Sequence, residues 1–383
     1  MLSAPLSVLL LNWRDLNHPE GGGSEKYLAE VAKGLAARGH RVTFRTAAYP
    51  GALPRETVDG VRYLRRGGRY SVYLRAIAAQ AVGRHRADVV VDVQNGVPFL
   101  TPLVRSGTPV INLVHHVHRE QWPVVFGPAV ARLGWWLESR VAPAVYRRSR
   151  YVAVSTSTKS ELGELGVEGD RVSVIHNGTD AVADEHVRRH EHPVVMVLGR
   201  LVPQKRVDIA MHAVRDLART HPELELWVVG SGYWDSELHR VAAELGITDR
   251  VTFTGHVSEA EKHRLLAQAW VLALPSLKEG WGLVVVEAGV HGTPTVAFAD
   301  AGGLNESVHD GETGLLVHGG QAEFTAALGG LLDDPQRRQQ MSGRVVEWVT
   351  KFRWPETVSL WEKQLYAAAG HSLHPSENNR TDH

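Results

Sequence analysis

Two carboxylates, Glu279 and Glu287, bracket an otherwise apolar, glycine-rich segment, LKEGWGLVVVEAGVHGTPTVAF, at residues 277–298. The valines at 284–286 favour a buried strand with two edge carboxylates, because β-branched side chains suit strands. The glycines favour a second interpretation, in which LVVVEAGV starts a helix whose N-terminal amides face an anion. In a helix, the two carboxylates would lie roughly 12 Å apart along the axis. They would then reach opposite ends of one extended ligand, unlike the acid pair of a glycoside hydrolase, which flanks one bond.

Other glycines and polar residues follow further predicted strands, at the end where open α/β sheets bind ligands. They are Gly21 to Gly23, Asn95, His115, Arg200 with Lys205, Gly230, Gly232 and His256. The dinucleotide fingerprint G-x-G-x-x-G is absent, since GGGSEK and GSGYWD both lack its last glycine, and the phosphate loop G-x-x-x-x-G-K-[ST] is absent as well. The sequence therefore argues against a nicotinamide dehydrogenase and against a P-loop nucleotide hydrolase.

The composition is that of a globular protein with more than one core. A chain of 383 residues exceeds what one hydrophobic core usually serves, so we expect two domains. Lys plus Arg and Asp plus Glu balance at 42 each, so no net field attracts nucleic acid. The chain has no Cys, which excludes disulfides and thiolate chemistry and fits the cytoplasm. We see no secretory signal and no apolar run of the roughly 20 residues needed to span a bilayer.

Strand-like and helix-like segments alternate along the chain, which predicts parallel sheets covered by helices. The pattern begins with LSVLLLNW and a helix from EKYLAEV, and it restarts at VVMVLGR near residue 194. Two successive α/β units are the simplest account. The polar segment 176–193 contains an Asn-Gly turn signal, so we place the boundary near residue 182. The tail at 370–383 has little apolar surface to bury, and we expect it to be disordered.

An ordered set of segments resembles the retaining glycosyltransferases of family four. In the second half these are VLGRLVPQKRVD, LWVVGSG, VTFTGHVS, PSLKEGWGLVVVEAGVHGTPTVA and GGLNESVHDGETGLLV, and upstream they are VSTSTKSEL and VIHNGTD. The resemblance spans residues 6 to about 365. It implies the GT-B fold, an α/β architecture of two Rossmann-like domains facing a deep cleft. By this resemblance, 1–182 is the acceptor domain, 183–354 is the donor domain, and a C-terminal helix at 355–369 crosses back to the first domain as part of a hinge.

The resemblance assigns the donor site mainly to the second half. The two carboxylates match the family's Glu-x7-Glu motif, in which the first acid lies near the donor sugar and the second holds the nucleotide ribose. Backbone at Gly282, Leu283 and Val284 would cap the diphosphate. Arg200 and Lys205 match a basic pair that neutralises the leaving diphosphate, and this chain lacks the Asp-x-Asp of metal-dependent sugar transferases. We therefore expect no metal and no other cofactor.

The first half contributes residues that face the donor. Gly22 and Gly23 match a glycine loop that approaches the diphosphate, although both can also serve only a tight turn. His115 matches a histidine that contacts the sugar, but this chain continues with His116 where the family often has Asp, so either histidine can fill that role. A metal cluster of both with His118 is a further alternative. Glu306 also matches a position near the donor, with a purely structural role as the alternative.

The implied activity is transfer of a sugar from a nucleotide-diphosphate sugar to a hydroxyl acceptor in cell-envelope glycan or glycolipid synthesis. Glycosylation of a specialised metabolite and non-catalytic nucleotide-sugar binding are the alternatives. The nucleotide base, the sugar, the acceptor, the linkage and the oligomeric state stay open. The segment 131–151 carries Trp135, Trp136 and five arginines, which suit either an interfacial helix or a packed helix with a basic end. We accordingly expect a cytoplasmic protein. If the segment 131–151 is an interfacial helix, the protein also contacts the inner face of the membrane peripherally.

Overall fold

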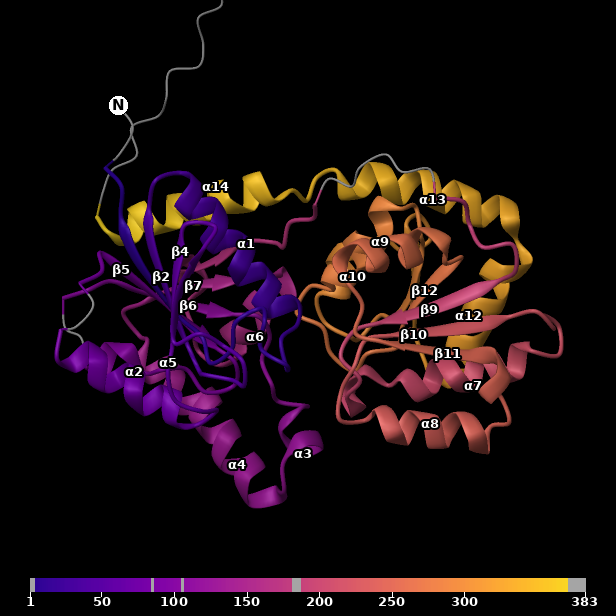
Figure 1. Ribbon diagram of the computed structural model, residues 1–383, viewed down its shortest axis with the longest axis horizontal. Helices are drawn as coiled ribbons and strands as arrows, with labels where there is room; N and C mark the ends of the chain where they lie inside the picture. Colours follow the sequence, from indigo (N-terminus) through magenta and orange to yellow (C-terminus); the bar gives the residue numbers. More distant parts are fainter. Residues whose placement is uncertain (1–3, 84–85, 105–106, 181–186, 371–383) are drawn as a thin grey trace, which may run out of the picture.

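The computed structural model describes residues 4–83, 86–104, 107–180 and 187–370, which form two α/β units beside one another (Figure 1). The predicted architecture of two such units is confirmed. The predicted boundary at residue 182, and all but the first residue of the tail predicted at 370–383, lie outside the described residues.

Each unit is built on one sheet. In the described residues, the N-terminal sheet runs in the order β3 (Arg55–Val58), β4 (Val61–Arg65), β2 (Arg41–Thr46), β1 (Ser7–Leu11), β5 (Val89–Gln94), β6 (Val110–Val114), β7 (Arg150–Ala153) and β8 (Val172–Val174). The C-terminal sheet runs β11 (Val251–Gly255), β10 (Glu225–Val229), β9 (Val194–Leu198), β12 (Val271–Leu274), β13 (Thr295–Phe298) and β14 (Gly314–Val317). The central strands β5, β6, β9 and β12 are buried throughout, as expected when helices cover both faces of a parallel sheet.

Helices cover the sheets of both units. In the first unit they are α1 (Gly23–Ala37), α2 (Ser71–Ala81), α3 (Trp122–Val125), α4 (Pro128–Trp136), α5 (Ala142–Val145) and α6 (Thr156–Glu164). In the second they are α7 (Val207–Leu217), α8 (Asp235–Glu244), α9 (Glu259–Gln268), α10 (Leu283–Val290), α11 (Leu304–Ser307), α12 (Gln321–Asp333) and α13 (Pro335–Val349), whereas the last described helix, α14 (Trp354–Ala368), lies on the first unit. No helix within the described ranges is long and apolar enough to cross a bilayer.

The single antiparallel pairing in the described sheets joins β3 to β4 at the edge of the N-terminal sheet. Asp59 and Gly60 connect the two strands, and both have positive φ, at 50° and 77°. Two successive residues of this kind make the tight turn that suits the twist of a hairpin. The sequence contains this Asp-Gly signal, but our strand assignment above does not include the hairpin.

The predicted helix over 131–151 is not continuous. Helix α4 ends at Trp136, a π-helical turn spans Leu137–Val141, and α5 covers only Ala142–Val145. The π-helical turn directs the side chain of Glu138 into the protein, where it is fully buried. Helices α3 and α4 project from the body of the N-terminal unit (Figure 1).

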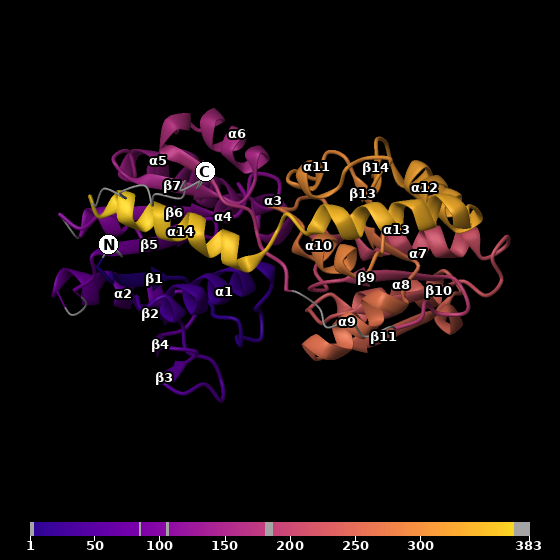
Figure 2. The same ribbon diagram turned by 90° about the horizontal axis from the view of Figure 1, so that it is seen from above.

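The last two helices connect the units. Helix α13 packs against α10 of the C-terminal unit, and α14 lies along α1 of the N-terminal unit (Figure 2). The contact with α1 is close, because a Cβ at Gly34 would collide with Val358. The buried Trp361 donates a hydrogen bond of 2.6 Å to the Tyr27 hydroxyl. The chain therefore ends its described part on the unit in which it began.

Candidate active site

Helix α10 stands at the junction of the two units and carries the acidic motif. Gly282 precedes it with a left-handed φ of 86°, and a Cβ at Gly282 would collide with Leu304. Val285 and Val286 are buried, and Gly289 lies directly against Val345 and Val349 of α13. Packing therefore overrides the strand preference of the valines, and the strand interpretation of this segment is wrong. Leu283 and Val284 occupy the first turn, where backbone amides have no partner in the helix.

Glu279 lies before this helix and pairs with Lys205. The Lys205 amine contacts Glu279 Oε1, and the two side chains are 21% and 13% exposed. Lys205 belongs to a short 3₁₀ turn, Pro203–Lys205, that follows strand β9. The Glu279 backbone is also fixed, because its amide donates to Ala301 O at 2.9 Å and its carbonyl accepts from Gly303 at 3.0 Å. A carboxylate and an amine thus stand together at the carboxyl end of the sheet.

Arg200 stands near the same end of β9. Within the described part of the chain, no carboxylate lies within ion-pair distance of its guanidinium. Its pKa is lowered by burial and by the neighbouring Arg14, and the Arg200 side chain reaches the N-terminal unit, where a Cβ at Gly22 would lie 3.4 Å from its Nε. A partly buried cation without a counter-ion is costly unless it meets an anion. Arg200 is therefore well placed to bind an anionic ligand.

The glycine loop faces these groups from the N-terminal unit. Gly22 caps α1, and its amide donates a 2.9 Å hydrogen bond to Glu25 Oε2. A Cβ at Gly23 would touch the side chain of Leu283, at 3.7 Å. The loop thus lies directly against the start of α10. The Gly22 amide, however, is already bonded within its own helix cap.

His115 ends strand β6 on the opposite wall. Its ring meets the Tyr27 ring edge-on with centroids 5.5 Å apart, and its Nε2 atom is buried without a hydrogen-bond partner. Burial lowers the pKa of His115 to about 4, so the ring is neutral at pH 7. A Cβ at Gly280 would collide with the His115 carbonyl, so the two units meet here backbone to backbone.

The neighbouring histidines turn away from His115. His116 bonds to Gln121 at 3.1 Å, and its ring packs at a tilt against that of His118, with centroids 4.2 Å apart. His118 Nδ1 lies 3.0 Å from the buried Glu138 carboxylate. The three histidines do not form a metal-binding group in the described residues. His115 alone among them packs on α1 beside the glycine loop.

Glu287, on the second turn of α10, is held by two lysines. Lys26 Nζ lies 2.9 Å and Lys262 Nζ 2.8 Å from the same oxygen, Oε1. Lys262 belongs to α9 of the same unit, whereas Lys26 belongs to α1 of the other unit. Glu287 is only 4% exposed. Both lysines also contact Glu259, at 2.9 and 2.8 Å.

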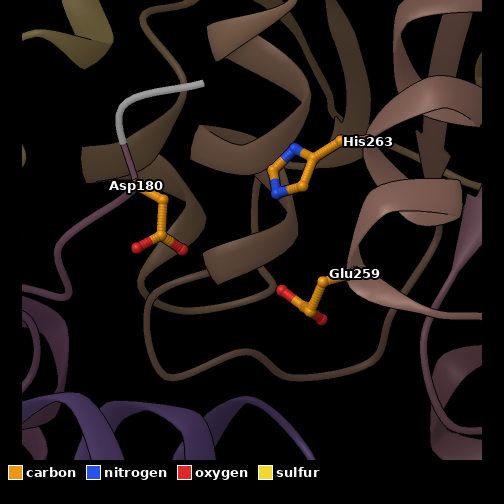
Figure 3. A group of neighbouring side chains, drawn as sticks. All are labelled: Asp180, Glu259 and His263. Atoms are coloured by element: carbon orange, nitrogen blue, oxygen red, sulfur yellow. The ribbon is translucent and has the colours of Figure 1, made fainter. Parts of the chain in front are cut away.

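A pocket of about 610 Å³ opens beside this cluster, between α1, the chain before residue 181 and α9. Its walls include Lys26, Glu30, Asp180, His256, Glu259 and His291. Asp180, Glu259 and His263 bring their ligand atoms within 4.8 Å of one another (Figure 3). Lys26 Nζ, however, lies 3.2 Å from Asp180 and already supplies a cation to both carboxylates. The group is therefore a poorly matched metal site.

Glu306 forms its contacts across the junction of the two units. Its carboxylate accepts hydrogen bonds of 2.9 and 3.0 Å from the Thr156 and Ser157 amides, at the N-terminus of α6 in the N-terminal unit. The charge suits the positive end of that helix. Glu306 therefore joins the two units in this state, and its role at the donor stays a prediction.

The structure thus brings Gly22, Gly23, Arg200, Leu283 and His115 to the junction between the units, with the Lys205–Glu279 pair beside them. Sequence reasoning missed three residues that complete this junction: Glu25, Lys26 and Lys262. Glu25 bonds Arg14 at 3.0 Å, and the lysines bond Glu287. The capping pattern of α1 pointed to Glu25, but nothing in the sequence paired Lys26 with residues more than 200 positions away.

Both halves of the chain match models of known protein families. Residues 21–182 match the model for Glycosyltransferase Family 4, and residues 179–347 match that for Glycosyl transferases group 1. A D-inositol 3-phosphate glycosyltransferase of Nocardia farcinica is 30% identical, over 93% of this chain and 90% of its own. A GDP-mannose-dependent alpha-(1-6)-phosphatidylinositol monomannoside mannosyltransferase of Mycolicibacterium smegmatis is also 30% identical, over 88% and 92%.

Solved structures agree on the fold. Sucrose-phosphate synthase of Thermosynechococcus elongatus superposes with a TM-score of 0.79 at 21% identity, covering 94% of this chain and 98% of its own. Anabaena Alr3699/HepE, solved in complex with UDP and glucose, gives 0.73 at 20% identity over 94% and 100%. With relatives of this similarity over nearly its whole length, the chain belongs to the GT-B glycosyltransferases and transfers a sugar from a nucleotide sugar.

Proposed function

We propose that this glycosyltransferase works without a metal ion and retains the anomeric configuration of the transferred sugar. The observation that carries the proposal is the position of Arg200, a partly buried guanidinium without a counter-ion in the described residues, beside Gly22 of the loop that lies against the start of α10. The donor diphosphate would lie there, contacted by Arg200, by Lys205 and by the amides of Leu283 and Val284. The sugar would extend toward Glu279 and His115, and the ribose toward Glu287.

Two cations and a helix N-terminus can replace a metal ion in this arrangement. A cation about 4 Å from a phosphate oxygen contributes roughly 4 kcal/mol at an effective dielectric constant of 20. Two such cations therefore offset much of the charge that develops on the leaving diphosphate. Lys205 would exchange part of its contact with Glu279 for the phosphate, which leaves Glu279 free to accept sugar hydroxyls.

Retention is proposed to follow from attack on the face that the diphosphate leaves. The bond between the anomeric carbon and the phosphate oxygen breaks, and the acceptor oxygen forms its bond to the same face of that carbon. The departing phosphate oxygen takes the acceptor proton. Glu279 and the neutral His115 then orient the sugar and stabilise its developing positive charge, and neither forms a covalent bond to it.

The proposed acceptor is inferred from the names of the relatives. Their names state action on D-inositol 3-phosphate and on phosphatidylinositol monomannoside. We therefore propose a phosphorylated polyol or a lipid headgroup as the acceptor, with the hydroxyl entering from the N-terminal unit beside His115.

The projecting helices α3 and α4 suit peripheral contact with a membrane. They expose apolar side chains, with exposed fractions of 40 to 56%, at Val124, Val125, Val130, Leu133 and Trp136. Arg132 and Arg140 are exposed on the same segment. Apolar side chains flanked by arginines bind anionic bilayer surfaces. We propose that the protein acts in the cytoplasm at the inner face of the membrane.

Vesicle binding tests this surface. We expect co-flotation with phosphatidylglycerol vesicles, its loss in Leu133→Glu, and no loss in Leu360→Glu, which alters an exposed leucine of α14. If Leu133→Glu and Leu360→Glu float with the vesicles to the same extent, the exposed surface of α3 and α4 does not bind the membrane.

A donor screen tests the proposed chemistry. UDP-, GDP-, ADP- and dTDP-sugars are added in EDTA, and a bound sugar nucleotide at 100 times its Kd should stabilise the protein by about 2.7 kcal/mol. The stabilising donor is then incubated with polyol phosphates and phospholipids, and the anomer of the product is determined by NMR. An inverted product contradicts retention, and transfer abolished by EDTA contradicts metal independence. Binding without transfer to any acceptor would favour the non-catalytic alternative.

A further inference from the structure

Lys26 comes from the N-terminal unit, but both of its side-chain hydrogen bonds go to carboxylates of the C-terminal unit. Its ammonium lies 2.9 Å from Glu287 Oε1, 2.9 Å from Glu259 Oε2 and 3.2 Å from Asp180 Oδ2. Its ammonium donates hydrogen bonds to Glu287 and Glu259 and forms an ion pair with Asp180. Glu287 and Glu259 belong to the C-terminal unit, and Asp180 ends the described stretch 107–180.

Lys262 provides an internal comparison, because it contacts two of the same carboxylates from within the C-terminal unit. Its amine lies 2.8 Å from Glu287 Oε1 and 2.8 Å from Glu259 Oε2. The side chains of Lys26 and Lys262 are similarly buried, at 11% and 9% exposed. The two lysines therefore supply the same charge at the same distance, and they differ in the unit that carries them.

The cluster is costly as a purely structural feature. The cluster has two lysines and three carboxylates, of which the lysines and Glu287 are buried, whereas Asp180 and Glu259 are 43% and 66% exposed. Burial by itself lowers the pKa of Lys26, but the charges of Glu287 and Glu259 and the hydrogen bonds to both together outweigh burial and raise it. Buried ion pairs of this kind contribute little net stability compared with apolar packing. The arrangement is better explained by a ligand that needs Glu287 charged and fixed.

Glu287 retains capacity for such a ligand. Both lysines contact Oε1, and in the described part of the chain Oε2 has no hydrogen-bond partner. Lys26 and Glu259 of the same cluster line the pocket of about 610 Å³, whereas Glu287 is not part of its wall. A ribose would reach Oε2 from the junction of the two units while Oε1 stays clamped by the two amines.

We infer that Lys26 is a donor-positioning residue supplied across the cleft, which holds the Glu287 carboxylate in the orientation that binds the nucleotide ribose. The inference rests on the proposed function, because it takes Glu287 as the ribose carboxylate. Lys26 can do this only when the two units are closed, since Glu287 and Glu259 lie in the other unit. Closure of the cleft and binding of the ribose are therefore coupled through one amine, whereas Lys262 supports Glu287 in either state.

Nucleotide binding by matched variants tests this role. Lys26→Met, Lys262→Met and Lys26→Arg are compared with the control Lys33→Met, which alters an exposed lysine of the same helix. Calorimetry measures the affinity for UDP and GDP and for their 2′,3′-dideoxy forms, which lack the ribose hydroxyls. Small-angle scattering with and without nucleotide measures closure, and donor kinetics give KM and kcat separately.

We expect Lys26→Met to lose affinity for the preferred nucleotide by at least about tenfold, with the loss in donor KM rather than kcat. The dideoxy form should bind equally to this variant and to wild type, and Lys26→Arg should recover most of the affinity. Lys262→Met should lose affinity but still close, whereas Lys26→Met should close less. Lys33→Met should match wild type.

Two results would overturn the inference in distinguishable ways. In the first, wild type binds UDP or GDP and Lys26→Met either binds that nucleotide equally well or loses as much affinity for its dideoxy form as for the nucleotide itself. Lys26 then has no role at the ribose, and the proposed function still stands. If wild type and Lys33→Met bind neither nucleotide, the proposed donor site itself fails, and the role of Lys26 fails with it.

Discussion

The two ends of helix α10 each pair a glutamate with lysine, but they assemble the pair differently. At the sugar end, Glu279 meets Lys205, and both residues belong to the C-terminal unit. At the ribose end, Glu287 meets Lys262 from its own unit and Lys26 from the other. The sugar-end pair is 13 and 21% exposed, whereas Glu287 is 5% exposed in its side chain. The charge pair at the sugar end is thus complete within one unit, and that at the ribose end depends on both.

This difference separates two tasks along one rigid helix. A pair held within a single unit keeps its geometry while the cleft opens and closes, which suits the group that must meet the reacting sugar. A pair completed by closure instead makes ligand binding and domain movement interdependent. We therefore expect changes at Glu279 to affect the chemical step, and changes at Glu287 to affect donor binding.

Glu279→Gln should produce the largest effect. The amide keeps the shape of the side chain but removes the negative charge that would stabilise the sugar as the diphosphate departs. Loss of one such electrostatic group costs about 10² to 10³-fold in kcat. Steady-state kinetics with the preferred donor measure the loss, and calorimetry with the nucleoside diphosphate should give an affinity within about threefold of wild type. Normal turnover by this variant would contradict the assignment of the sugar end.

Acid stability gives the next largest contrast, because each end of α10 has a histidine whose pKa is lowered to about 4. Burial is the main cause for His115, beside Gly280, and for His291, which caps the C-terminus of α10. Between pH 6.5 and about 4 the unfolded chain binds these protons and the folded chain does not, so stability falls as the pH falls. For the fully buried His115 this loss amounts to about 3 kcal/mol.

Asparagine variants separate the two histidines. His115→Asn should flatten the dependence of unfolding free energy on pH in this window more than His291→Asn, because His291 is partly exposed and water screens its charge. Denaturant unfolding at pH 7.5 and pH 5 measures both slopes. Equal slopes in wild type and His115→Asn would show that the imidazole at the sugar end is not held neutral by burial.

Glu287→Gln should act on binding and stability together. We expect the donor KM to rise by about tenfold, because a neutral amide cannot accept two ribose hydroxyls while bonded to two ammonium groups. kcat should change by less than about threefold, in contrast to Glu279→Gln. Thermal unfolding should also occur at a lower temperature, since Lys26 and Lys262 lose one of their carboxylates. A fall in kcat with unchanged KM would reverse the assignment of the two ends.

The sequence indicated the architecture because each layer left a local signal. Apolar runs such as VVMVL and VINLV predicted buried parallel strands, and the helical spacing after Gly23 predicted α1. The start of α10 was ambiguous, because three valines favour a strand while Gly282 favours a helix start. Only the packing of Gly289 against α13 decides between them, and that contact joins residues more than fifty positions apart.

Site residues could be predicted from the sequence where a charged residue directly follows a predicted strand. Arg200, Lys205 and Glu279 could be named from their place after strands, and their proximity follows from the parallel sheet. Lys26 could not be named, because its role depends on how α1 of one unit meets α9 and α10 of the other. Helical periodicity alone would read Lys26 as a solvent-exposed residue of α1.

Glu306→Gln should give the smallest effect and tests whether contacts between the units matter at the sugar end. The glutamine can still accept hydrogen bonds from the Thr156 and Ser157 amides, but it loses the interaction of a full charge with the N-terminus of α6. That interaction contributes about 0.3 to 1 kcal/mol, so the population of the closed state should fall by up to about fivefold.

Small-angle scattering with saturating nucleotide measures closure, and Glu347→Gln, at an exposed position of α13, is the control. Glu306 lies on α11, which directly follows Gly303, and the Gly303 amide donates to the Glu279 carbonyl. Weaker closure should therefore raise the donor KM a few-fold, and this effect should add to the tenfold effect of Glu287→Gln. If Glu306→Gln instead lowers kcat as strongly as Glu279→Gln, its carboxylate acts on the donor sugar, and the sugar end is built from both units after all.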